Sequence, residues 1–386
     1  MLIIIPIFVG NAWAQHLQSF LFNGKNGSNP KGGLVVDSAG NFYGSTFWGE
    51  NIYRINLTSE ATIYKFSDSN GDGQNPIGDL ILDSAGNLYG VTQAGGYTGG
   101  ACTQTSGCGT VFELSPPASP GGAWTETVLH TFQATSSTDG ASPEAGLLFD
   151  SAGNLYGTTV YGGTNDLGTV FELMPPSQPG GTWTESILYS FGQGAADGVN
   201  PSSQLIFDQQ ANLYGTTELG ANDNNGGMIF ELSPPLAQGG AWTESVLHRF
   251  SLVDGDAPVA GLTWGPDGAL FGTAAHDGPN GGGTVFRFSP PSGKGGWTYY
   301  VLYSFPKAAG FPAARVIFNG SNVLYGTTVN GANVFQISYS GGRAIESVLA
   351  QPGASYAGVV LYEDALYGVT IGSDLSQLGT VYRLSH

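Results

Sequence analysis

One short phrase, an apolar or aromatic residue followed by Tyr or Phe and then Gly, occurs seven times along this chain. The copies lie at residues 42–44, 88–90, 155–157, 213–215, 270–272, 324–326 and 366–368. Intervals of roughly 40 to 70 residues are typical of architectures that stack one supersecondary unit on itself. We therefore expect one repeat domain, although 386 residues would otherwise suggest two or three domains.

The third copy shows the unit most clearly. A Gly153-containing turn separates two short strands, and a third strand with alternating apolar residues and an aromatic-rich fourth strand follow. The predicted strands cover residues 146–150, 155–161, 168–173 and 183–191. No helical periodicity is present, so the unit is predicted to be a blade of four antiparallel strands. Seven such units indicate an all-β fold, a seven-bladed β-propeller.

The last repeat lacks its fourth strand, because the chain ends soon after the strand at residues 379–384. The missing strand has a counterpart at the other end, where residues 16–20 resemble the outer strands at 128–132 and 188–191. We therefore expect the N-terminal strand to complete the last blade. Closure of this kind removes the exposed edges of an open sheet.

Composition and the N-terminal segment bear on location and partners. The formal net charge of −18 argues against nucleic acid as a partner, which requires a basic surface. Residues 2–9 are apolar and Ala12-Trp13-Ala14 resembles a leader-peptidase site. We expect residues 1–14 to be a signal peptide remnant, too short to span a membrane, and residues 15–386 to form a secreted or periplasmic domain. The alternative is that the apolar segment is a buried strand.

The two cysteines, Cys102 and Cys108, lie in one predicted loop of the second blade. In an exported protein, a local disulfide is the natural interpretation. A metal pair is the alternative, but no histidine or third cysteine lies nearby in the sequence.

The third repeat also carries a family resemblance. Residues 146–163 read Gly-Leu-x-x-Asp-Ser-Ala-Gly-Asn-Leu-Tyr-Gly-Thr-Thr-x-x-Gly-Gly, and residues 168–173 read Gly-Thr-Val-Phe-Glu-Leu. This pattern resembles the GloVer tandem repeat of exported bacterial proteins, over essentially the whole mature chain. The resemblance implies a released bacterial product and brings no settled activity with it. A weaker similarity to NHL-type and gluconolactonase-like propellers concerns the scaffold.

The NHL-like pattern implies that the apolar run at 147–149 is innermost. The loops that enter each blade and the loops after each second strand then share one face, where binding is expected. The entry loops repeat Asp-Gly-x-x-Pro, which is typical of a turn whose carboxylate caps backbone N–H groups. A few residues after its entry loop, the second blade has Asp79. Three other blades have a glycine at the equivalent position, namely Gly33, Gly146 and Gly261.

One entry loop also resembles the start of a calcium loop, Asp-x-Asn-x-Asp-Gly, with a carboxylate at position twelve. The predicted Ca²⁺ ligands are Asp68, Asn70, Asp72, Gln74 and Asp79. An ordinary acidic turn is the alternative. Such an ion would be structural.

A second feature of the loop face is a position that varies where its surroundings repeat. It is occupied by Trp48, Tyr161, His276 and Asn330, among others. We consider these four residues candidate ligand-binding residues for a sugar ring and its hydroxyl groups, against the alternative that the position merely tolerates change.

Catalytic signals are weak. His276, Asp277 and Glu218 are the candidates, and no nucleophile elbow, zinc motif or phosphate loop is present. We expect a binding or interaction module whose partner is a glycan or a surface protein. The alternatives are an enzyme on the same face, either a metal-assisted lactonase or a polysaccharide lyase or hydrolase, and a structural component of an extracellular assembly.

Overall fold

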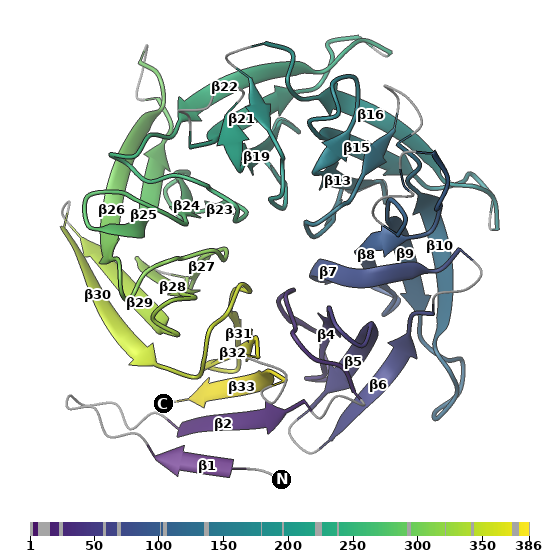
Figure 1. The fold of residues 1–386 in the computed structure, drawn as a ribbon, viewed down its shortest axis with the longest axis horizontal. Helices are drawn as coiled ribbons and strands as arrows, with labels where there is room; N and C mark the ends of the chain where they lie inside the picture. Colours follow the sequence, from purple (N-terminus) through teal and green to yellow (C-terminus); the bar gives the residue numbers. More distant parts are fainter. Residues whose placement is uncertain are drawn as a thin grey trace.

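The computed structural model is a ring of seven antiparallel sheets around a central axis (Figure 1). This confirms the all-β, seven-bladed propeller. The structure describes residues 3–6, 16–22, 26–56, 59–67, 71–100, 102, 106–134, 139–178, 180–194, 197–220, 226–237, 239–291, 295–320, 322–340, 343–372 and 378–385. This described part contains no helix that is long and apolar enough to cross a membrane.

Each of the first six blades has four strands, named in order from the innermost to the outermost. The first three blades are β3 (Val35–Val36), β4 (Phe42–Thr46), β5 (Asn51–Ile55) and β6 (Glu60–Lys65); β7 (Gly73–Leu82), β8 (Leu88–Gly95), β9 (Thr110–Ser115) and β10 (Thr125–Thr131); and β12 (Leu148–Phe149), β13 (Leu155–Thr159), β15 (Thr169–Met174) and β16 (Thr184–Ser190). The next three are β18 (Ile206–Phe207), β19 (Leu213–Thr217), β21 (Met228–Ser233) and β22 (Thr243–Arg249); β23 (Thr263–Trp264), β24 (Leu270–Ala274), β25 (Gly281–Ser289) and β26 (Thr298–Pro306); and β27 (Ile317–Phe318), β28 (Val323–Thr327), β29 (Val334–Ser340) and β30 (Arg343–Ala350).

The seventh blade closes the ring with both ends of the chain. Its strands are β31 (Val360–Tyr362), β32 (Ala365–Thr370), β33 (Thr380–Ser385) and β2 (His16–Leu21). Strand β2 pairs antiparallel with β33, from His16 opposite Ser385 to Leu21 opposite Thr380, which confirms closure by the N-terminal strand. Strand β1 (Ile3–Pro6), from the predicted leader segment, pairs with β2 and adds a fifth strand outside it (Figure 1).

The repeated glycine has a steric cause. Gly157 on β13 lies opposite Phe171 on β15, and a Cβ at Gly157 would lie 2.5 Å from the Phe171 ring. Only glycine lets the aromatic ring cross the second strand without displacing it. The same pairing occurs at Gly44 and Tyr53, Gly90 and Phe112, Gly215 and Phe230, Gly272 and Phe286, Gly326 and Phe335, and Gly368 and Tyr382.

The Asp-Ser-Ala-Gly-Asn turn is held by its aspartate. Asp150 accepts hydrogen bonds from the backbone N–H groups of Ala152 and Asn154, at 2.8 and 2.9 Å, and from the Asn154 side chain at 2.8 Å. The hydroxyl of Tyr156, from the seven-copy phrase, lies 3.3 Å from the same carboxylate and 2.7 Å from Oε1 of Glu172. Equivalent sets form at Asp37, Asp83 and Asp208, so one turn explains two recurring parts of the repeat unit.

Apolar packing lies between neighbouring blades. One cluster joins Val170 and Phe191 of the third blade to Leu205, Leu213 and Phe230 of the fourth. A comparable cluster joins the seventh blade to the first. Because each blade shares its apolar surface with two neighbours, ring closure buries the last exposed faces.

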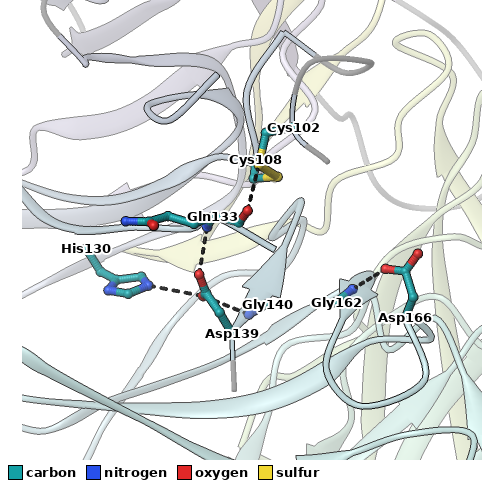
Figure 2. The surroundings of a disulfide bond; sticks show 8 residues. All are labelled: Cys102, Cys108, His130, Gln133, Asp139, Gly140, Gly162 and Asp166. Atoms are coloured by element: carbon teal, nitrogen blue, oxygen red, sulfur yellow. Dashed lines mark hydrogen bonds and ion pairs between the residues drawn. A yellow bond between two sulfur atoms is a disulfide. The ribbon is translucent and has the colours of Figure 1, made fainter. Parts of the chain in front are cut away.

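The predicted disulfide is present. Cys102 and Cys108 are bonded, with their Cα atoms 5.1 Å apart. The Cys102 sulfur also lies 3.1 Å from the carbonyl oxygen of Gln133, just after the outer strand β10 (Figure 2). The disulfide therefore closes a short loop between β8 and β9, and this loop lies against the end of the outer strand.

Candidate functional site

The two predicted loop sets meet on one face of the ring. The short strand β11 (Gly140–Ala141) pairs with β14 (Tyr161–Gly162), and β17 (Gly198–Val199) pairs with β20 (Leu219–Gly220). Isolated bridges join Ser28 to Trp48 and Asp256 to His276 in the same way. In these four blades the entry loop is therefore paired with the segment that follows the second strand.

The aspartate of each Asp-Gly-x-x-Pro loop has the capping role that the sequence predicts. Asp197 accepts hydrogen bonds from the backbone N–H groups of Gln193 and Gly198, at 2.8 and 2.7 Å, and from the Tyr189 hydroxyl at 3.1 Å. Asp72, Asp139 and Asp254 make corresponding contacts, with a histidine in place of the tyrosine at two of them. His130 and His248 thus lie in outer strands, each beside the aspartate of an entry loop.

The predicted calcium ligands are placed apart. Asp68 and Asn70 lie outside the described residues. Asp72 caps its own turn, and Gln74 lies in β7, opposite Ala94. Residues 73–82 continue as strand β7 and do not close a twelve-residue loop, so Asp79 is carried toward the channel. The role of Asp79 as the last ligand of that loop stays a prediction, and the structure places this residue in the wall of the central pocket. Calcium binding around Asp72 stays a prediction.

A pocket of about 480 Å³ occupies the middle of the ring. Seven equivalent positions line it, one from each blade, and we call them the inner ring: Gly33, Asp79, Gly146, Gln204, Gly261, Arg315 and Gly358. Polar side chains come from the second, fourth and sixth blades, and glycines occupy the other four positions. The volume is in the range of small-molecule sites.

The glycines of the inner ring make room for the polar side chains. A Cβ at Gly146 would lie 2.8 Å from the carbonyl oxygen of Asp79 and 3.1 Å from Nε2 of Gln204. A Cβ at Gly33 would lie 2.8 Å from the Asp79 carboxylate. All three distances are below ordinary contact, so side chains at these two glycine positions would crowd the pocket wall.

Contacts within the protein satisfy only part of the hydrogen-bonding capacity of the three polar side chains. Asp79 Oδ1 accepts a hydrogen bond from the Gly33 backbone N–H at 2.6 Å, and its other oxygen lies 4.0 Å from Nη2 of Arg315. Gln204 donates through Nε2 to the Leu147 carbonyl at 2.8 Å. Its Oε1 is buried and has no hydrogen-bond partner among the described residues. The same holds for Oγ of Ser202 in the same wall. Buried acceptors of this kind need a ligand or water.

A second set of seven positions, two residues before the inner ring, forms the rim of the pocket. We call it the rim ring: Lys31, Ile77, Glu144, Ser202, Val259, Ala313 and Tyr356. Glu144 accepts a hydrogen bond from Nε2 of Gln93 at 2.6 Å. Burial lowers the pKa of the Lys31 ammonium, and Glu144 opposes this shift. The rim therefore carries both signs of charge beside the exposed ring of Tyr356.

Among the four predicted ligand-binding residues, Trp48 lines the pocket and is 52% exposed. Tyr161, His276 and Asn330 lie on the same face but do not line it. The His276 ring lies against Phe311, with ring centroids 4.6 Å apart. The structure therefore brings Trp48, and not the other three, to the central pocket.

The predicted catalytic residues form a loose group on this face. Burial raises the pKa of Glu218, the nearby carboxylate of Glu144 raises it further, and His276 opposes the rise. Burial also raises the pKa of Asp256, which His276 opposes and Asp277 reinforces. Glu218 and His276 thus interact electrostatically, while Asp277 acts on a different carboxylate.

Gln204, Arg315, Glu144 and Tyr356 are pocket residues that the sequence reasoning missed. Their signal is departure from a repeated pattern. Gln204 and Arg315 occupy the slot in which four other blades have glycine, and Glu144 and Tyr356 stand where several blades have a small or apolar residue. Aligning all seven repeats at Asp79 would have found both rings.

Comparisons with known proteins agree with this architecture. The family described as the Gloeobacter/Verrucomicrobia repeat matches residues 101–336. No curated protein sequence matches the chain. Virginiamycin B lyase from Staphylococcus aureus, in a catalytically inactive variant with quinupristin, has a TM-score of 0.60 at 15% identity, over 96% of this chain and 99% of its own.

Two other structures are similar. A streptogramin B lyase has a TM-score of 0.58 at 16% identity, covering 96% of this chain and 97% of its own. A candidate 6-phosphogluconolactonase from Bacteroides uniformis has a TM-score of 0.53 at 14% identity, covering 91% and 94%. At these identities the likeness concerns the fold.

Proposed function

Because the chain belongs to the Gloeobacter/Verrucomicrobia repeat family, we propose that it is an exported propeller that binds a carbohydrate with charged substituents in its central pocket. The observation that carries the proposal is the inner ring, where Asp79, Gln204 and Arg315 alternate with glycines around one pocket.

The chemistry of these side chains favours a polar ligand. Arg315 offers a planar fork of donors for a carboxylate or vicinal hydroxyls, and Asp79 accepts hydrogen bonds from hydroxyl groups. The unpaired Oε1 of Gln204 is a further acceptor among the described residues. A ligand that satisfies all three groups needs hydroxyls and an anionic group, as uronic-acid sugars have.

Two aromatic side chains at the pocket favour a ligand that contains a sugar ring. Trp48 and Tyr356 are 52% and 41% exposed and both line the pocket. The negative face of an aromatic ring attracts the polarised C–H groups of a sugar. Exposed aromatic rings beside a polar pocket therefore fit a ligand that is apolar on one face and hydroxylated at its edge.

Binding can be tested by calorimetric titration of the protein with oligogalacturonates and with neutral oligosaccharides of the same length. The proposal expects saturable binding of the acidic sugars. Arg315→Ala and Trp48→Ala should each weaken it at least tenfold, and Leu252→Ala, an exposed residue that does not line the pocket, should not. Equal or absent binding of both sugar classes would refute the proposal.

Catalysis on the same face is the second candidate. The support is the pair Glu218 and His276, which interact electrostatically on the loop face, where burial raises the pKa of Glu218. Related rings include proteins named as lyases. Loss of turnover of a bound oligogalacturonate in both Glu218→Gln and His276→Ala, with binding unchanged, would support it. No turnover by the wild-type protein would eliminate it for these sugars.

A further inference from the structure

A histidine and two carboxylates meet where the outer strands of the second and third blades lie side by side, away from the central pocket. His130 comes from β10, Asp139 from the segment just before β11, and Glu185 from β16. One ligand atom from each lies within 4.8 Å of the other two. Figure 2 shows His130 pointing toward Asp139.

The distances in this cluster are long for hydrogen bonds. His130 Nε2 lies 3.5 Å from Oδ1 of Asp139 and 3.7 Å from Oε2 of Glu185. Ligand atoms around a tetrahedral Zn²⁺ at about 2.1 Å are separated by about 3.4 Å. The two spacings from the imidazole therefore match a shared ion better than a hydrogen bond to either carboxylate, and all three ligand atoms lie within 4.8 Å of one another.

Equivalent junctions elsewhere in the ring provide an internal comparison. At the next junction Tyr189 stands in place of the histidine and donates to Asp197 at 3.1 Å, beside Glu244. At the following one His248 contacts Asp254 at 2.8 Å, and Tyr299, stacked on the imidazole, replaces the glutamate. These two junctions close by direct hydrogen bonds, and neither combines an imidazole with two carboxylates.

The cluster is also shielded and incompletely satisfied. The Glu185 side chain is 10% exposed. Its Oε1 is buried without a hydrogen-bond partner among the described residues, as is Oε1 of Glu126 and of Glu244 at the equivalent positions of other blades. Asp139 is fixed independently, because its two oxygens accept from the backbone N–H groups of Gly140 and Gln133 at 2.8 and 2.7 Å. The carboxylate is thus held in position with lone pairs left over.

We propose that His130, Asp139 and Glu185 bind a divalent transition-metal ion, Zn²⁺ by preference, with water as the fourth ligand. An imidazole with two carboxylates suits Zn²⁺ better than Ca²⁺, which prefers oxygen ligands in larger number. The ion links the outer strands of two adjacent blades and replaces the hydrogen bond that closes the other junctions. Its role is structural, and it is independent of the sugar site and of the predicted calcium loop.

The test is titration of chelator-treated protein with ZnCl₂, followed by calorimetry and thermal unfolding. The proposal expects one Zn²⁺ per chain and an unfolding temperature that rises with Zn²⁺, since an ion that binds the folded state stabilises it. His130→Tyr, which installs the residue found at position 189, should abolish the response while keeping the fold. Glu185→Gln should weaken binding at least tenfold.

Two controls make the result specific. His248→Tyr alters the equivalent histidine at a junction without a glutamate, and His276→Ala removes the exposed histidine of the loop face; both should keep the wild-type response. Co²⁺ in place of Zn²⁺ should give visible absorption bands that are lost in His130→Tyr. Absence of Zn²⁺ binding, or binding unchanged in His130→Tyr, would overturn the proposal.

Discussion

Asp79 and Arg315 face one another across the central pocket, with Oδ2 of Asp79 4.0 Å from Nη2 of Arg315. Their side chains are 35% and 38% exposed, so the pair lies in contact with solvent and is not a buried ion pair. An exposed pair at this separation contributes little to stability, about 1 kcal/mol or less. The two charges are therefore available to a ligand.

The first prediction is that substitutions of this pair weaken ligand binding and hardly change stability. Asp79→Asn and Arg315→Ala should each change the free energy of unfolding by about 1 kcal/mol or less, because the ion pair is weak, while weakening the binding of oligogalacturonate at least tenfold. Chemical denaturation and calorimetric titration of the same preparations measure both quantities. A large loss of stability without loss of binding would show that the pair serves the fold.

The inner-ring glycines give a second prediction. Gly146→Ala should weaken sugar binding because its Cβ would press on Asp79 and Gln204, at 2.8 and 3.1 Å. Gly296→Ala is the matched control, since a Cβ there meets no atom within 4 Å. Calorimetric titration of both variants distinguishes a crowded pocket from a general effect of adding a methyl group. Equal affinities in the two would contradict the role of the glycines in shaping the pocket.

Stability should depend on pH through buried glutamates between the blades. Burial raises the pKa of Glu126 and of Glu244 to about 7, with Asp72 and Asp197 adding to the rise. A folded-state pKa above the unfolded value means that their contribution is present below about pH 4.5 and is lost as pH rises through 7. The protein should therefore be less stable at pH 8 than at pH 5.

Replacement of these glutamates checks the assignment. Glu126→Gln and Glu244→Gln should each raise the free energy of unfolding at pH 8 by about 1 kcal/mol, after allowance for partial solvent exposure, and should flatten its pH dependence. Leu252→Ala, at an exposed position, changes no titratable group and should leave the pH dependence as in the wild type. Denaturation series at both pH values measure the effect.

The capping aspartates supply a fourth prediction, which also tests calcium. Asp72→Ala and Asp197→Ala should each lower the free energy of unfolding by about 1 to 3 kcal/mol, because each removes the acceptor of two backbone N–H groups. The predicted calcium loop contains Asp72 and not Asp197. Ca²⁺ should therefore raise the unfolding temperature of the wild type and of Asp197→Ala, but not of Asp72→Ala. No shift in the wild type would refute the calcium loop.

The architecture was predictable because its causes are local and repeated. Two kinds of contact lie within one blade. The ring of Phe171 lies against Gly157, and the carboxylate of Asp150 contacts Asn154 and Tyr156. Each contact requires the same residue types at equivalent positions of most repeats, so the pattern occurs several times in the sequence. The closing strand could be recognised for the same reason, since residues 16–20 resemble the outer strands of other blades.

The pocket could not be predicted in the same way. Asp79, Gln204 and Arg315 meet because ring closure places three separate blades around one axis, and each of them occurs once. Asp79 illustrates the difficulty: its spacing from Asp68 predicts position twelve of a calcium loop and gives no indication that the residue lines the central pocket. The proposed Zn²⁺ cluster has the same origin, because Glu185 belongs to a different blade from His130.

The pairing of β2 with β33 also has a consequence for how the ring assembles. The contact between His16 and Ser385 joins segments separated by almost the whole chain, and contacts of such sequence separation form late because of the entropy of closing the loop. During synthesis the blades emerge in order, and β2, which is made early, lacks its partner β33 until the last blade is available. A nascent chain with six blades therefore has two open faces and a free strand, and it is at this stage that the protein depends most on protection from association with other chains.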